Sequence, residues 1–88
     1  MKSMHVDLWV DFHRIDEDGL TLANARHARA GLHLHRDDYV VVGDDDCEPA
    51  LARVVELDED GFMRLRVLPG DAADYPDLLA KAAAVGAS

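Results

Sequence analysis

The sequence has little cysteine and no long apolar run. Its single cysteine, Cys47, excludes a disulfide within the chain and favours a reducing compartment. No stretch approaches the roughly 20 apolar residues that a membrane-spanning helix needs. Residues 1–12 carry Asp7 and Asp11 inside their apolar part and show no cleavage-site pattern, so we expect no signal peptide. Together these absences predict a cytoplasmic protein.

Basic residues are also scarce. Nine Lys and Arg side chains stand against 18 Asp and Glu, which gives a formal net charge of −9. Binding to a nucleic-acid backbone requires many cationic side chains, and anionic membranes attract basic segments. We therefore expect no direct binding to a nucleic-acid backbone and no membrane binding. The strong use of Ala, Asp and Arg over Lys is typical of a GC-rich bacterial genome.

The sequence lacks motifs of catalysis and cofactor binding. It contains no nucleophile elbow, P-loop or dinucleotide fingerprint. Cys47 stands among acidic residues, whose negative charge disfavours the reactive thiolate. We therefore predict that the protein is not an enzyme and needs no cofactor.

Aromatic residues number only five in a chain of 88. A chain of this length forms one domain with a small core, and its free energy of unfolding should be only about a few kcal/mol. Pairing with a second copy would add stability, so a homodimer is one of the expected states.

The clearest structural pattern is a β-hairpin within Ala50–Pro69. Two runs rich in Val and Leu flank Asp58–Gly61, and a three-residue loop that ends in Gly61 pairs Asp58 with Phe62. The pairs that follow from this register are Leu57–Met63, Glu56–Arg64, Val55–Leu65 and Val54–Arg66. The apolar face would consist of Val55, Leu57, Met63, Leu65 and Val67, and the other face would carry Arg66 and the Glu56–Arg64 pair.

A second strand is predicted over His5–His13, where apolar and polar side chains alternate. The apolar face consists of Val6, Leu8, Val10 and Phe12. Trp9 falls on the polar face. Either another element covers that face, which we favour, or Trp9 is an exposed contact residue that anchors an interface.

The middle of the chain mixes strand and turn patterns. Ile15–Leu20 closely repeats the turn sequence Leu57–Phe62 of the hairpin described above. We therefore expect a second hairpin here, with Leu20–Leu22 as its returning strand. Over Ala23–Ala30, helical turns and an irregular loop fit equally well. The alternating residues 32–35 predict a short strand, and Tyr39–Val42 predict a stronger one.

Five or six short strands in fewer than 70 residues predict a closed or nearly closed small barrel. The run from Asp38 to Pro69, DYVVVGDDDCEPALARVVELDEDGFMRLRVLP, resembles the core of SH3-like small barrels. In these, a D-x-V-x-V strand leads through a loop to A-x-V-x-x-L, an acidic glycine turn and an x-V-x-V strand. The resemblance implies an SH3-like barrel. Together with the strand patterns and the helical pattern of residues 71–88, it predicts a mainly β fold: a small SH3-like barrel of five to six antiparallel strands with a short C-terminal α-helix. It implies no specific function, because such barrels bind many unrelated ligands.

A helical pattern follows the barrel. Pro76 suits the first turn of a helix, and Asp74 and Asp77 favour its positive N-terminal end. The apolar stripe consists of Leu78, Leu79, Ala82, Ala83 and Val85. A helix this short is marginal alone. We therefore expect a barrel domain over residues 1–70 and a helical extension over residues 71–88 that packs on the barrel or on a partner.

Two groups of side chains are candidate sites. His33 and His35 would share one face of a strand, and with Cys47 or His13 they could bind zinc or another transition metal. A single H-x-H pair is, however, more typical of solvent-facing histidines. The basic stretch from Thr21 to Arg36 has no acidic residue and holds Arg26, Arg29 and Arg36. It could dock on the chain's own acidic loops, on a second copy or on an anionic ligand.

These patterns favour a non-enzymatic interaction module that homodimerises or binds a protein partner. Its candidate contact residues are Trp9, Arg26, Arg29, Arg36, Leu78 and Leu79. The first alternative is an acidic inhibitor of a basic nucleic-acid-binding protein, in the manner of an antitoxin or immunity protein. The second is a weak metal- or ligand-binding barrel that uses His33, His35 and Cys47.

Overall fold

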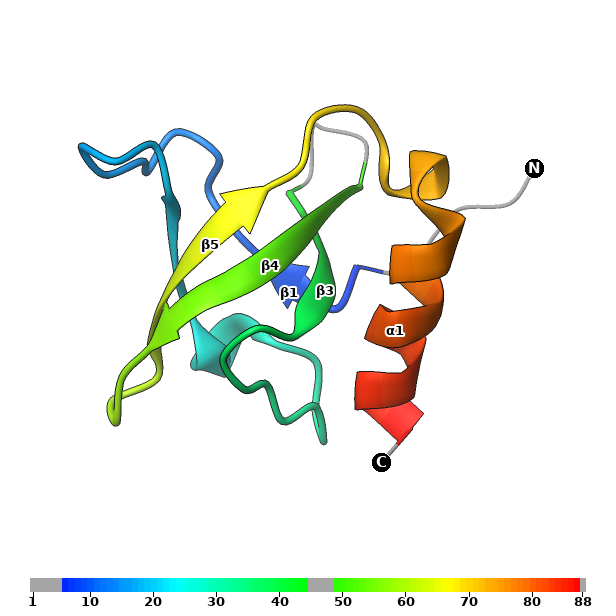
Figure 1. Cartoon of the computed structure of the whole chain (residues 1–88). Coiled ribbons are helices and arrows are strands. Elements are labelled where there is room, and N and C mark those ends of the chain that lie inside the picture. The colour runs from blue at the N-terminus through cyan, green and yellow to red at the C-terminus, as the bar shows by residue number, and fades with distance from the viewer. Residues whose placement is uncertain (1–5, 45–48, 88) are drawn as a thin grey trace.

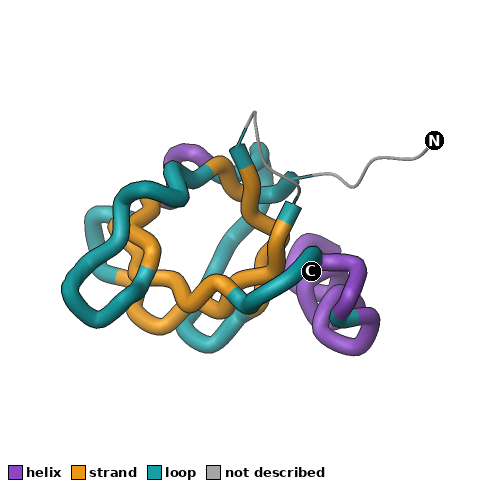
Figure 2. The backbone as a smooth tube through the Cα atoms, turned by 90° about the horizontal axis from the view of Figure 1, so that it is seen from above, coloured by secondary structure: helices purple, strands orange, loops and turns teal. Residues whose placement is uncertain are grey.

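The computed structural model describes residues 6–44 and 49–87, with side chains up to residue 83. One sheet of five strands curls into a nearly closed barrel with a C-terminal helix on its outside (Figures 1 and 2). The elements are β1 (Leu8–Trp9), β2 (Thr21–Asn24), the short 3-10 helix η1 (Ala25–His27), β3 (Tyr39–Gly43), β4 (Ala50–Leu57), β5 (Phe62–Val67), the 3-10 helix η2 (Ala72–Asp74) and α1 (Pro76–Ala87). The mainly β fold with a short terminal helix is confirmed.

The strand order in the sheet is β1-β3-β4-β5-β2. Three of its pairings are antiparallel, but β1 runs parallel to β3, with Leu8 beside Val42. The prediction of an all-antiparallel barrel is therefore wrong for β1. The long connection between β1 and β3 permits this, because parallel pairing needs a connection of a dozen residues or more. The predicted strand His5–His13 is reduced to Leu8–Trp9 within the described residues, which begin at Val6.

The hairpin of β4 and β5 follows the predicted register only near its turn. Leu57 pairs with Met63 and Glu56 with Arg64. Farther along, the ladder shifts by one residue, so that Leu65 faces Val54 rather than Val55, and Arg66 faces Arg53. Val55 is the extra residue of a β-bulge, which increases the local twist and helps a strand to curve. Val54 is consequently the fully buried member of the pair, and Val55 is half-buried.

The two acidic turns have the same geometry. In each, the Oδ1 atom of the first aspartate, Asp16 or Asp58, accepts hydrogen bonds of 2.9–3.0 Å from the backbone N–H groups two and four residues ahead. The glycine three residues ahead has a left-handed backbone, with φ of 81° at Gly19 and 89° at Gly61. The predicted second hairpin forms only next to its turn, where Thr21 bridges Ile15 and the Leu22 N–H donates to the Arg14 carbonyl at 2.8 Å. The returning strand continues as β2, which pairs along β5.

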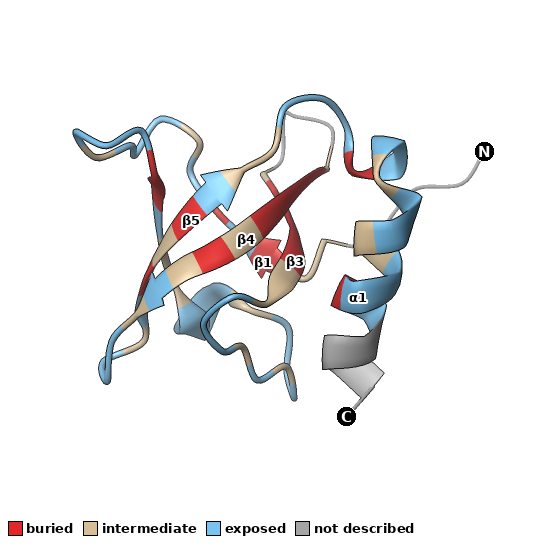
Figure 3. Cartoon of the chain, in the orientation of Figure 1, coloured by how far each residue is buried: buried red, intermediate tan, exposed pale blue. Residues whose placement is uncertain are grey.

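The structure has two hydrophobic clusters. One fills the barrel interior, and the other lies between the helix and the outside of the barrel. The interior consists of Leu8, Val10, Val40, Val42, Ala50, Ala52, Val54, Met63 and Leu65. On the outside of β3 and β4, Val41 and Leu51 join Ala72 and Ala82 in the second cluster, against which Leu78 and Leu79 pack. Because β3 is buried on both faces (Figure 3), its sequence is an uninterrupted valine run rather than an alternating one.

Helix α1 begins at Pro76 as predicted. The buried apolar stripe of this helix is narrower than predicted, since Ala82 is buried but Ala83 is exposed. The side chain of Val85 lies outside the described residues.

Between β2 and β3 the chain is irregular. The Asn24 side chain accepts a 2.9 Å hydrogen bond from the Arg26 N–H and begins η1. The ambiguous segment Ala23–Ala30 is therefore the end of a strand, a single helical turn and a loop. Leu32 and Leu34 pack against the barrel core, as the alternation suggested, but residues 32–35 form no strand.

Candidate functional site: a groove between the two edges of the sheet

Among the described large apolar side chains, most are buried or half-buried and four are exposed. Trp9 is 47% exposed, Ile15 54%, Leu22 36% and Phe62 60%. Trp9, Leu22 and Phe62 line one groove of about 800 Å³, whereas Ile15 lies outside it. The preferred expectation that another element covers Trp9 is wrong. Leu8 points into the core, so its neighbour Trp9 points outward, where no described residue buries it.

The groove lies between the two ends of the sheet. Trp9, Val10 and Asp11 line it from the β1 side, and β2 contributes Leu22, Ala23 and Asn24. The tip of the β4–β5 hairpin contributes further lining residues. In the ladder between β2 and β5, Leu22 faces Arg64 and Asn24 faces Phe62. Leu22 and Phe62 are therefore diagonal neighbours on one face of the sheet, within reach of a common ligand.

Four arginines and three acidic side chains line this groove, although the whole chain carries a net charge of −9. The acidic groups are engaged: Glu56 accepts a 3.0 Å hydrogen bond from Arg64, Asp58 binds backbone N–H groups of its turn, and Asp11 accepts from the His13 N–H. The other three arginines, Arg14, Arg26 and Arg36, form no ion pair with any residue that the structure describes.

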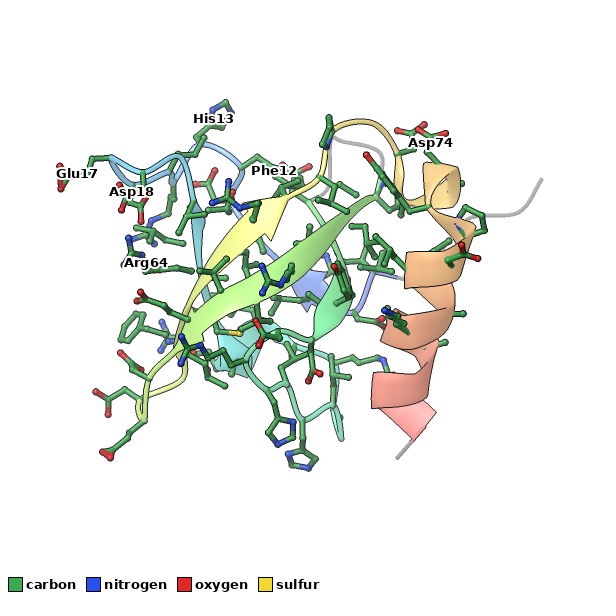
Figure 4. The ribbon with its side chains drawn as sticks, viewed as in Figure 1. Phe12, His13, Glu17, Asp18, Arg64 and Asp74 are labelled. Carbon is green, nitrogen blue, oxygen red and sulfur yellow. The ribbon has the colours of Figure 1, made fainter. Side chains whose placement is uncertain are left out.

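Arg64 binds carboxylates from two parts of the chain. Its guanidinium donates to Glu56 at 3.0 Å, to Asp16 at 2.8 Å and to Asp18 at 2.9 Å. Figure 4 shows Asp18 beside Arg64. The hydrogen bond from the Leu20 N–H and those from Arg64 lower the pKa of Asp16. The bonds to Asp16 and Glu56 raise the pKa of Arg64. Arg64 thus fastens the first acidic turn to the β4–β5 hairpin at the edge of the groove.

The predicted contact residues separate into three groups. Trp9, Arg26 and Arg36 are brought together in the groove. Arg29 lies outside it and forms an ion pair of 2.7 Å with Asp7. Leu78 and Leu79 are half-buried against the second hydrophobic cluster.

Sequence reasoning did not select Arg14, Leu22 or Phe62 as contact residues. Phe62 carried a signal, because it stands two residues from Arg64 and therefore shares the polar face of the hairpin. Leu22 carried none, because its exposure beside the buried Thr21 is known only from the structure. For Arg14 we find no such signal.

The predicted metal ligands do not form a cluster among the described residues. His33 and His35 are exposed, and His35 Nδ1 lies 3.5 Å from Asp38 Oδ2. Cys47 lies outside the described residues. Within residues 6–44 and 49–87, no group of three or more His, Cys, Asp and Glu side chains is arranged to hold a metal ion. Over the same residues, no helix has the length and apolar character to cross a membrane.

No protein-family model, curated protein or solved structure matches this chain. A functional assignment therefore depends on the geometry of the groove.

Proposed function

We propose that this chain is a non-enzymatic protein-interaction module of the bacterial cytoplasm, which uses an SH3-like barrel to bind a protein partner through the groove. One observation carries the proposal. Of the four large apolar side chains that are exposed in the described part of the chain, three gather in a single groove. Three arginines that have no partner among the described residues line the same groove. Aromatic and arginine side chains are the residues that most often dominate the energy of an interface.

The charge of the groove favours a different protein over a second copy bound groove to groove. In a two-fold symmetric dimer the same patch of both copies meets, which would bring the unpaired arginines of each copy together. Such like-charge contacts are costly. A homodimer, which would stabilise so small a core, would therefore have to use another surface.

The two alternatives have less support. An acidic inhibitor would present a gathered negative face, but Glu17 and Asp74 lie on opposite sides of the molecule (Figure 4). Several other carboxylates are already engaged by Arg64. A metal-binding barrel would need a third ligand near His33 and His35, and the described residues supply no such cluster.

The test is capture of the partner from the native cell with the tagged full-length chain and two variants. Phe62→Ala removes the most exposed apolar side chain of the groove, and Ile15→Ala removes a comparably exposed one outside it. We expect a specific partner to be retained by the wild type and by Ile15→Ala and lost with Phe62→Ala.

Two further results would oppose the proposal. One is a partner that Phe62→Ala retains as well as the wild type does. The other is a monomer in light scattering that captures no specific partner under low-salt conditions.

A further inference from the structure

The groove coincides with the one seam at which the described barrel is not closed by a strand ladder. Strands β1 and β2 are the two ends of the sheet. At one end of the seam, the Leu22 N–H donates to the Arg14 carbonyl at 2.8 Å. At the other, the Arg29 N–H donates to the Asp7 carbonyl at 2.8 Å, beside the isolated bridge from Leu8 to Ala28. Between these contacts, no described residue pairs with β2 on the side away from β5.

The backbone of β2 offers hydrogen-bonding groups to this seam. The bond from Leu22 to Arg14 shows that the Leu22 N–H points away from β5. Backbone groups of alternate residues in an antiparallel strand point to the same side, so the Leu22 C=O and the Asn24 N–H also point into the seam. The C=O of Asn24 is already used, because Asn24 is the N-cap of η1. An open edge of this kind is a template for another strand.

The side chains around the seam match an extended acidic segment. Because side chains of a strand alternate between its two faces, every second side chain would turn inward toward Val10, Ala23 and Met63 of the groove. The others would turn outward, where Trp9 and Leu22 are exposed. Arg14, Arg26 and Arg36 can bind its carboxylates. A helix would fit less well, since its backbone groups are bonded internally and cannot pair with β2.

We propose that the partner supplies an extended acidic segment that pairs, as a short added strand, with the free backbone groups of β2 between the two contacts at the ends of the seam. This inference rests on the proposed function and specifies the form of the bound segment. Main-chain bonds to Leu22 and Asn24 would supply affinity, and the arginines and apolar side chains would supply specificity.

The test uses a synthetic peptide of about eight residues, the length of a strand, in which valine and glutamate alternate. A second peptide has the same composition with valines at helical spacing, and a third replaces glutamate by lysine. Binding is followed by the emission of Trp9, the single tryptophan of the chain, and by hydrogen exchange of the Asn24 amide in NMR spectra. We expect only the alternating glutamate peptide to shift the emission and to slow the exchange.

Two variants separate the charge contribution from other effects. Arg26→Gln removes a cation of the groove, and Arg66→Gln removes an exposed arginine of β5 outside it. We expect Arg26→Gln to weaken the glutamate peptide about tenfold, as loss of a charge-assisted contact would, and Arg66→Gln to leave its affinity unchanged.

Each contrary outcome has a distinct meaning. Equal binding of the two glutamate peptides, or binding that leaves Asn24 exchange unchanged, overturns the added strand but not the proposed function. Absence of binding by all three peptides also overturns the acidic added strand. A native partner that Phe62→Ala retains overturns the proposed function itself. Protection of Asn24 that rises with protein concentration alone identifies a second copy as the occupant and overturns the separate partner.

Discussion

The Nε atom of Arg64 donates a 2.8 Å hydrogen bond to Oδ2 of Asp16, a residue 48 positions earlier in the chain. Asp16 uses its other oxygen, Oδ1, for the backbone of its own turn. One carboxylate therefore shapes a local turn and joins that turn to the β4–β5 hairpin. The contact also fixes the position of β2, which leaves this turn and forms one wall of the groove.

We expect Asp16→Asn to destabilise the protein more than Glu17→Gln does. An asparagine oxygen can still accept the turn bonds, but it loses the charge that Arg64 binds. Glu17 belongs to the same turn, is exposed and forms no ion pair among the described residues. Urea unfolding measures the effect as a lower midpoint with an unchanged slope. Equal midpoints for the two variants would contradict a structural role for the Arg64 contact.

The stability of the protein should fall on acidification in part through Asp16. The pKa of Asp16 is lowered from 3.8 in the folded state, mainly by the Leu20 N–H, with Arg64 contributing. A lowered folded pKa stabilises the protein above the unfolded pKa, and this stabilisation is lost as the pH falls through the folded pKa. Thermal unfolding measured from neutral pH to below 3.8 should therefore show a steeper loss in the wild type than in Asp16→Asn. Parallel curves would exclude this contribution.

Local chemistry made much of the fold predictable. The acidic glycine turns, the valine run of β3 and the proline start of α1 each depend on residues close together in the sequence. The Glu56–Arg64 contact follows from the register next to the turn. The bulge at Val55 did not follow, because it meets a demand for curvature that arises only when the whole sheet closes.

The groove was only partly predictable for the same reason. Trp9 and the arginines stood out by their residue types. Their assembly with Phe62 depends on β1 pairing in parallel with β3, and on β2 pairing with β5 rather than with the strand before it. Both pairings join distant parts of the chain. The additional contacts of Arg64 with Asp16 and Asp18 escaped prediction because they bridge 48 and 46 positions.

Because of the bulge, two adjacent valines should contribute unequally to the free energy of unfolding. Val54→Ala should lower the free energy of unfolding by about 2 kcal/mol, since it removes fully buried methyl groups and leaves a cavity. Val55→Ala, at the half-buried bulge, should cost about 1 kcal/mol or less. Both are the same exchange in the same strand, so β-propensity affects them similarly. If denaturant unfolding shows that Val55→Ala is the more destabilising change, the result would contradict the bulge and favour the register predicted from the sequence.

Helix α1 supplies a test of what holds it to the barrel. Leu79 is half-buried and packs against the second hydrophobic cluster, which contains Val41 and Leu51, so Leu79→Ala should lower the free energy of unfolding by about 1–3 kcal/mol. Lys81→Gln changes an exposed position of the same helix to a residue of similar helix propensity and should have little effect. Both variants should retain the proposed partner at temperatures where they remain folded, because neither side chain lines the groove. If Leu79→Ala instead unfolds like the wild type and loses the partner, the helix rather than the groove is the binding surface.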